Sequence, residues 1–166
     1  MHLWIGRHCY AGDQSQDPET ERSRPLTPEG VRMAKAIANA MLDAGEIPNT
    51  IFCSPLIRAQ MTADIYGRIL GVSNVLNLGD LGPWRPLTPS LTNLVSVKGA
   101  ERMRRLMLVG HVDNTTPAMQ DLATKEKWKP LVMGEMRRVE IDRDSLEWSL
   151  QWGIKPSDLG LKDYDK

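Results

Sequence analysis

Long hydrophobic runs are missing from this sequence of 166 residues. No stretch approaches the roughly 18 consecutive apolar residues that a membrane helix needs. Nor does a basic region, followed by an apolar stretch and a small-residue cleavage site, stand at the start. We therefore expect no membrane partner, and we expect the protein in the cytoplasm.

Cysteine is scarce too. Cys9 and Cys53 lie far apart, so they do not form a disulfide framework, and there is no CxxC motif. No cluster of cysteine and histidine has the spacing of a metal site. These absences predict reduced thiols, no metal and no cofactor.

The chain also lacks an excess of either charge, with 21 basic and 21 acidic side chains. A general nucleic-acid binder is usually basic overall, so we expect no nucleic-acid partner. Any anion must be held by a local cluster of arginine or lysine. Hydrophobic residues make up 41% of the sequence, which suffices for the core of one globular domain.

Short apolar segments alternate with segments of helical periodicity. This alternation predicts an α/β fold, a three-layer α/β/α sandwich around a mostly parallel six-stranded sheet. Residues 1–154 would form the domain and residues 155–166 a polar C-terminal tail on the surface. The predicted strands are His2–Gly6, Thr50–Cys53, Asn74–Leu78, Leu106–Val109 and a hairpin of Val132–Ile141 with Leu146–Trp152.

Helix starts are predicted from capping residues followed by proline. This signal occurs at Thr27-Pro28, at Ser54-Pro55 and at Thr116-Pro117, and a weaker helix is expected over Leu91–Arg105. The polar segment Ala11–Arg24 is expected to be a surface loop or a short lid.

Two of the three histidines directly follow apolar strands, His8 after Ile5-Gly6-Arg7 and His111 after Leu108-Val109-Gly110. Arg58 comes about one turn into the helix after the second strand. Ligands of open α/β sheets bind outside the carboxyl ends of the strands. We therefore expect these side chains to converge there.

The chemistry of two histidines with two arginines favours phosphoryl transfer. Guanidiniums hold phosphoryl oxygens in pairs, and an imidazole can attack phosphorus. A second imidazole, protonated near neutral pH, would add charge to the transition state. A single histidine after a strand is ordinarily a cap or core residue, but two weaken that interpretation. A two-histidine metal site completed by Asp113 or Cys9 is disfavoured because the arginines would repel a divalent cation.

Several motifs occur in an order that resembles the histidine phosphatase superfamily, which includes the phosphoglycerate mutases and acid phosphatases. The resemblance spans roughly residues 1–120, and the short length is most similar to SixA-type phosphohistidine phosphatases. The motifs are Arg7-His8, then Arg24-Pro25-Leu26-Thr27-Pro28-Glu29-Gly30, then Ser54-Pro55-Leu56-Ile57-Arg58-Ala59-Gln60-Met61-Thr62-Ala63, and then Val109-Gly110-His111.

The resemblance implies that His8 is the phospho-accepting nucleophile and that Arg7 and Arg58 are phosphate ligands. It makes His111 the second pocket histidine, with the Val112 amide nearby. Arg24 would fall beside the pocket, although an exposed loop arginine is an equal alternative. The implied strand order is 3-2-4-1-5-6, with the last strand antiparallel.

Two positions depart from the family pattern. Cys9 stands where glycine or alanine usually follows the nucleophile, either as a small packing residue or as a thiol that oxidants could reach. Leu78 stands where mutase-like members have a general-acid glutamate, and Val112 where acid phosphatases have aspartate. The candidate proton donors are therefore Asp80 and Asp113, unless these are only turn or cap residues.

The lack of an obvious proton donor affects which substrate is expected. An alkoxide leaving group needs a proton in the transition state, whereas the imidazole of a phosphohistidine needs much less help. A phosphohistidine protein is therefore one expected substrate. The alternatives are a small phosphomonoester such as a sugar or nucleotide phosphate, and an inactive phosphate-binding or protein-interaction module. A mutase is disfavoured, because the short chain leaves little room for segments that close over a substrate.

Overall fold

The computed structural model describes residues 1–83, 104–122, 129–142, 145 and 147–165. Within them, six strands form one sheet in the order β3-β2-β4-β1-β5-β6, which confirms the expected strand order. The strands are β1 His2–Arg7, β2 Thr50–Cys53, β3 Val75–Asn77, β4 Arg105–Gly110, β5 Met136–Ile141 and β6 Trp148–Ile154. The helices are α1 Pro18–Ser23, α2 Pro28–Asp43, α3 Ile57–Leu70 and α5 Val112–Leu122, with short 3-10 turns η1 Gly79–Leu81 and η3 Pro156–Leu159.

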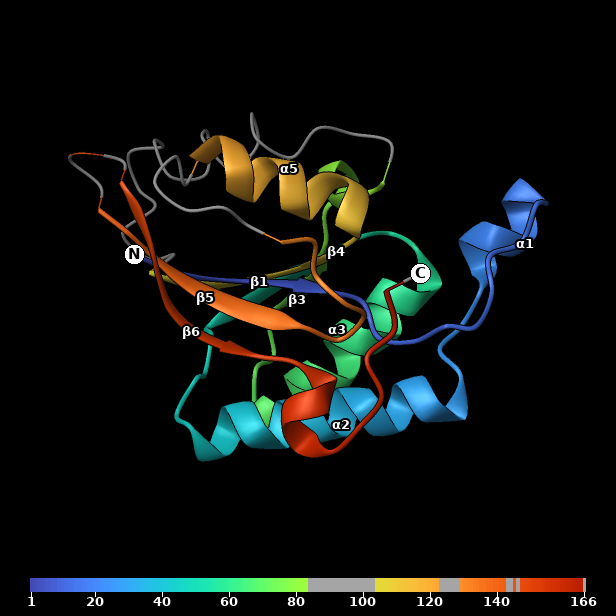
Figure 1. The fold of residues 1–166 in the computed structure, drawn as a ribbon, viewed down its shortest axis with the longest axis horizontal. Coiled ribbons are helices and arrows are strands. Elements are labelled where there is room, and N and C mark those ends of the chain that lie inside the picture. The colour runs from blue at the N-terminus through green and yellow to red at the C-terminus, as the bar shows by residue number, and fades with distance from the viewer. Residues whose placement is uncertain (84–103, 123–128, 143–144, 146, 166) are drawn as a thin grey trace.

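The sheet has a helical layer on each face, as the alternation of elements predicts. Figure 1 shows α2 and α3 on one face and α5 on the other. Residues of β1 alternate between the two sides: Trp4 packs in the core with α2 and α3, while Leu3 and Ile5 pack in the core with Met119 of α5. Burial on both faces explains why the strands β1 and β4 are apolar almost throughout.

Strand direction differs from the expectation in one respect. β1, β2, β3 and β4 pair in parallel, whereas β5 pairs antiparallel with β1 and β6 pairs antiparallel with β5. The reversed strand is therefore β5, and β6 runs in the direction of the first four. Because β5 and β6 pair antiparallel, the chain reverses its direction once more between them.

The capping signals are only partly correct. Thr27 caps α2 as predicted, and its hydroxyl accepts a hydrogen bond from the Gly30 amide at 3.1 Å. α3 begins at Ile57, after Leu56, and not at Ser54-Pro55. α5 begins at Val112, ahead of the predicted start, and contains Pro117 within its length. The predicted helix over Leu91–Arg105 lies largely outside the described residues.

The segment expected as a surface loop and the expected tail are both structured. α1 lies within the segment 11–24 and stands outside the three layers (Figure 1). After η3 the chain returns to the end of β1, where Leu161 and Tyr164 pack against the core. None of the helices in the described ranges is long and apolar enough to cross a membrane.

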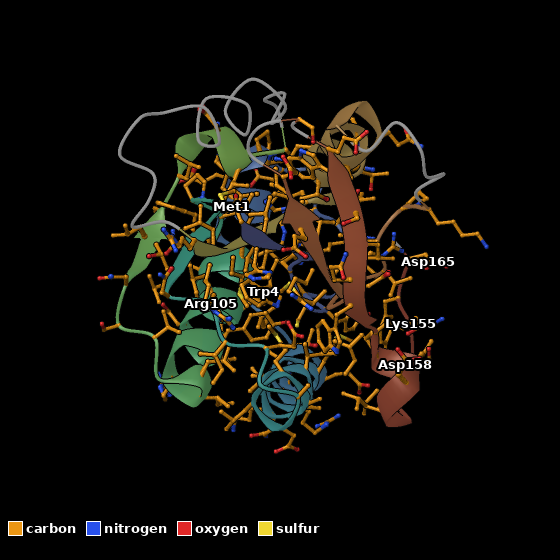
Figure 2. All side chains as sticks on the ribbon, turned by 90° about the vertical axis from the view of Figure 1, so that its left-hand side faces the viewer. Met1, Trp4, Arg105, Lys155, Asp158 and Asp165 are labelled. Atoms are coloured by element: carbon orange, nitrogen blue, oxygen red, sulfur yellow. The ribbon has the colours of Figure 1, made fainter. Side chains whose placement is uncertain are left out.

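Polar contacts join neighbouring strands toward the end of the sheet where the parallel strands β1 and β4 begin. The Trp4 indole donates to Glu46 at 3.0 Å, and the Arg105 guanidinium lies 5.0 Å from the centre of the Trp4 ring (Figure 2). Glu46 also pairs with Arg138 at 2.9 Å. These contacts hold β1, β4 and β5 together at the end of the sheet that carries no candidate site residue.

Candidate active site

A cavity of about 660 Å³ opens at the carboxyl end of the parallel strands. Seven of the eight candidate site residues line this cavity. The candidate residues at the strand ends therefore converge, as we expected from the sequence. Asp80, in η1, is not among the lining residues. The wall is formed by Arg7, His8, Asp13, Gln14, Ser15, Pro18, Glu21, Arg22, Arg24, Leu56, Arg58, Pro83, His111, Val112, Asp113, Met133 and Asp165.

His8 follows β1 and is buried, with 5% of its surface exposed. Its Nδ1 lies 2.8 Å from the carbonyl oxygen of Cys9, which can only accept, so Nδ1 carries the proton. Nε2 therefore holds a lone pair, and the Nε–H of Arg58 points at it over 3.2 Å. Burial, reinforced by the nearby His111, holds the His8 pKa well below its usual value, so the ring is neutral at neutral pH.

His111 ends β4 and lies beside His8, with 5.0 Å between the ring centres. Its Nε2 is 2.9 Å from the Ser54 hydroxyl, and its amide donates to the Asn114 side chain at 3.2 Å. Burial, with Arg58 and Arg7 adding to it, lowers the His111 pKa to about 3. This shift disfavours the protonated second imidazole that the sequence led us to expect, because burial and two nearby guanidiniums both oppose a further positive charge.

Arg7 is the last residue of β1, and one nitrogen of its guanidinium is bound by backbone carbonyl oxygens. Its Nη1 donates to the carbonyl oxygens of Leu131, at 3.0 Å, and Asp165, at 2.8 Å. Its Nε is buried and has no hydrogen-bond partner among the described residues. The edge formed by Nε and Nη2 thus keeps at least one donor for an anion in the cavity.

Arg58 lies in the first turn of α3, and its guanidinium is engaged on both sides. Besides His8, it contacts Glu21 twice: Nη1 donates to the Glu21 carbonyl at 2.8 Å, and Nη2 pairs with Oε1 of the carboxylate at 3.0 Å. Burial lowers the Arg58 pKa to about 10, with Glu21 opposing this effect. The arginine therefore stays charged at neutral pH.

Glu21 is a pocket residue that the sequence reasoning missed. The Arg24 guanidinium grips both of its carboxylate oxygens at 2.8 Å, and the Ser15 amide donates to Oε2 at 3.0 Å. Hydrogen bonds from Arg24 lower the Glu21 pKa to about 2. The three-residue spacing between Glu21 and Arg24 was the available signal, since residues three apart are neighbours on a helix.

Arg24 is not an exposed loop residue. Only 10% of its side chain is exposed, and it donates to the carbonyl oxygens of Ala11, at 2.7 Å, and Gly12, at 2.9 Å. It therefore braces the segment after His8 against α1, at the rim of the cavity.

Val112 and Asp113 form the first turn of α5 and face the cavity with its helix amino terminus. Unpaired amides and the helix dipole at such an end favour an anion. Leu78, at the position expected for a glutamate, packs against the core under α5. Of the two candidate proton donors, Asp113 lines the cavity and Asp80 does not.

Cys9 is fully buried beneath the site. Its amide donates to the Thr62 hydroxyl at 3.1 Å, and its sulfur lies 3.7 Å from the Tyr66 hydroxyl. Burial raises the Cys9 pKa to about 12, which keeps it as an unreactive thiol. These contacts favour the packing interpretation. In the described part of the chain, no three histidine, cysteine or acidic side chains group as metal ligands would.

Solved structures of phosphatases share this fold. The chain is similar to the protein histidine phosphatase SixA complexed with tungstate, with a TM-score of 0.83 and 22% identity over 96% of this chain and 99% of that one. A SixA-type protein from Agrobacterium tumefaciens gives 0.74 and 17% over 93% and 97%. The mycobacterial glucosyl-3-phosphoglycerate phosphatase bound to inorganic phosphate gives 0.67 and 18% over 91% and 95%.

At such identities the likeness shows the fold alone, and no curated protein sequence matches the chain. The sequence itself matches the family described as histidine phosphatase superfamily (branch 1) over residues 3–82, the part that carries Arg7, His8, Arg24 and Arg58. Family match, strand order and motif order agree, and the chain belongs to branch 1 of the histidine phosphatase superfamily.

Proposed function

We propose that this protein is a phosphatase that forms a covalent phosphohistidine on His8. The observation that carries the proposal is the state of the His8 ring. Its Nδ1–H is held by a backbone carbonyl, so Nε2 carries the lone pair at the cavity wall, where it accepts the Nε–H of Arg58 at 3.2 Å. A neutral, oriented imidazole next to a phosphate-binding guanidinium is the arrangement that nucleophilic attack on phosphorus requires.

In the first step, His8 Nε2 attacks phosphorus, a P–N bond forms and the bond to the leaving group breaks. Arg7 and Arg58 hold the phosphoryl oxygens and balance the charge that develops on them. His111 and Val112 also line the cavity, and the His111 ring and the Val112 amide would donate to the same group. As the phosphoryl group brings negative charge into the pocket, protonation of His111 becomes easier there.

In the second step, water attacks the phosphorus of phosphohistidine. The P–N bond breaks, inorganic phosphate leaves and His8 regains its neutral form with the proton on Nδ1. Both steps place the same charged group in the same pocket, so one set of donors serves them.

The leaving-group side of the cavity supports a phosphohistidine protein as substrate. Asp113 is the remaining candidate acid, and it lies exposed at the rim. A phosphoramidate needs little acid catalysis, because its leaving imidazole can already carry a proton. A small phosphomonoester, such as a sugar or nucleotide phosphate, is the second candidate, favoured if Asp113 does donate a proton. A cytoplasmic location is part of this proposal.

Turnover of p-nitrophenyl phosphate, a phosphohistidine protein and sugar phosphates tests the function, with His8→Ala as the comparison. We expect an acid-labile phosphoenzyme in the wild type and none in His8→Ala, with activity reduced by at least a thousandfold. No turnover and no trapped phosphoenzyme would support an inactive binding module. Turnover that survives in His8→Ala would refute the mechanism.

The role of Asp113 is tested by comparing leaving groups. If Asp113 donates the proton, Asp113→Asn should slow an alkyl phosphate about a hundredfold but p-nitrophenyl phosphate only a few-fold. Asp80→Asn is the matched control, since Asp80 does not line the cavity. Equal, small effects on both substrates would remove Asp113 from the mechanism and strengthen the phosphoramidate assignment.

A further inference from the structure

The Glu21 carboxylate lies inside a pocket that is otherwise built for an anion. It comes from α1, outside the three layers of the fold, and reaches Arg24 and Arg58 at the cavity wall. Side chains of both arginines are at least nine-tenths buried, as their exposures of 10% and 5% show. Glu21 is thus an internal anion among the groups proposed to bind phosphate.

The carboxylate occupies one particular edge of Arg58. Nε and Nη2 of an arginine lie on the same edge of the guanidinium and can hold two neighbouring acceptors. In Arg58, Nε points at His8 Nε2 over 3.2 Å, and Nη2 holds Glu21 Oε1 at 3.0 Å. A phosphoryl group that approaches His8 Nε2 must bring its oxygens to this edge. Glu21 Oε1 therefore stands where a phosphoryl oxygen would bind.

Arg7 provides the contrast within the same cavity. Its Nη1 is satisfied by two backbone carbonyls, and its buried Nε has no partner among the described residues. The hydrogen-bond partners of Arg7 in the described part of the chain are thus neutral backbone oxygens. Arg58, in contrast, is paired with the Glu21 carboxylate, whose negative charge would repel a negatively charged substrate.

From this geometry, and resting on the proposed phosphatase function, we infer that Glu21 determines anion affinity by competing with the phosphoryl group for Arg58. The Glu21 carboxylate keeps its two bonds to Arg24 while it gives up Nη2 of Arg58 to the substrate. The same competition acts on the product, so Glu21 weakens the binding of inorganic phosphate and speeds its release. Glu21 is then a specificity-determining residue, and α1 is the element that delivers it.

Removal of the charge should make the pocket a tighter anion site. Glu21→Gln keeps the shape and an acceptor for Arg24, but it removes the repulsion between a carboxylate and a phosphate at short range. We expect the dissociation constant of inorganic phosphate, measured by calorimetry, to fall about tenfold in Glu21→Gln. With p-nitrophenyl phosphate, KM and the phosphate inhibition constant should fall together, while kcat stays level or falls.

Glu29→Gln is the matched control. Glu29 also pairs with an arginine three residues on, Arg32, but Arg32 is exposed and neither side chain lines the cavity. Its phosphate affinity should equal that of the wild type. Glu21→Ala is the second test variant, since it empties the space and does not depend on how an amide orients. Thermal unfolding identifies which variants are folded.

Equal or weaker phosphate binding in the folded Glu21 variants would overturn the inference and make Glu21 a brace for α1. Calorimetry needs no turnover, so this outcome is independent of catalysis. Absence of phosphate binding in the wild type and in every variant would instead refute the proposed function itself, and this inference with it. A gain of phosphate affinity in Glu29→Gln equal to the gain in Glu21→Gln would also count against it.

Discussion

Protonation of single residues links the pocket to the stability of the fold. His8 and His111 are buried without charge, and the His111 pKa falls from its ordinary 6.5 to about 3. Below pH 6.5 the histidines of the unfolded chain become protonated, whereas His8 and His111 of the folded chain stay neutral. The unfolded state then binds more protons than the native state, so stability falls as pH falls through 6.5.

We therefore expect the free energy of unfolding to drop between pH 7.5 and pH 5.5, at up to about 1.4 kcal/mol per pH unit for each buried histidine. Urea unfolding at several pH values measures the drop. Glu21, with a pKa of about 2 when folded and 4.5 ordinarily, contributes only at lower pH. The double variant His8→Asn, His111→Asn should show a clearly flatter profile. An equal slope in that variant would mean that other groups bind the protons.

Glycine at one position fixes an element against the site. Gly30, in the first turn of α2, packs so closely on Tyr10 that a Cβ there would overlap the Tyr10 carbonyl. Tyr10 is two residues from His8, so the overlap would move the nucleophile's loop. This contact explains the glycine in the motif Leu26-Thr27-Pro28-Glu29-Gly30 in physical terms.

We expect Gly30→Ala to destabilise the protein by about 2 kcal/mol or more and to reduce phosphatase activity in parallel. Gly79→Ala is the control, since a Cβ at Gly79 meets nothing within 4 Å. Thermal unfolding and turnover of p-nitrophenyl phosphate measure both effects. A Gly30→Ala protein as stable and active as Gly79→Ala would show that the loop at Tyr10 adapts without loss.

Hydrogen bonds between residues close in sequence could be predicted, whereas those between distant segments could not. Thr27 caps α2 through an amide three residues away, a local signal that sequence reveals. Ser54 carries the same signal, but α3 begins only at Ile57. The Ser54 hydroxyl accepts from the Leu56 amide at 3.3 Å and also contacts His111, 57 residues along the chain, a partner that no local pattern indicates. Asp17 does cap α1, because its carboxylate accepts a hydrogen bond from the Thr20 amide at 2.8 Å. Asp17-Pro18 therefore carries the same helix-start signal, but the polar composition of the segment favoured a loop.

At the scale of the whole molecule, the meeting of His8, Arg58 and His111 could be predicted from the residues, since parallel strand ends share one edge of a sheet. The strand order was implied by the resemblance to the histidine phosphatase superfamily, and the sheet has that order. The contribution of the C-terminal segment could not be predicted. Its residues are polar and look like a surface tail, yet the carbonyl of Asp165 accepts from Arg7 at 2.8 Å. A backbone carbonyl carries no sequence signal, so no residue pattern could indicate this contact.

The C-terminal segment is held in place by stacking and by a backbone hydrogen bond. The ring of Tyr164 stacks on Tyr10, with 3.9 Å between centres, and the Met133 amide donates to the Tyr164 carbonyl at 2.8 Å. Loss of the stack should cost about 1 kcal/mol of the energy that keeps Asp165 against Arg7. We therefore expect Tyr164→Ala to loosen Arg7 and to raise KM for p-nitrophenyl phosphate several-fold, with little change in kcat.

Tyr164→Phe separates stacking from the phenol group, because it keeps the ring against Tyr10 and should behave as the wild type. Deletion of residues 163–166 removes both the ring and the Asp165 carbonyl, so its KM should rise at least as far as that of Tyr164→Ala. Arg7 would then keep only the Leu131 carbonyl on Nη1. If the deletion leaves KM and phosphate affinity unchanged, Arg7 is positioned by β1 and Leu131 alone, and the segment after η3 contributes packing to the fold but nothing to the phosphate pocket.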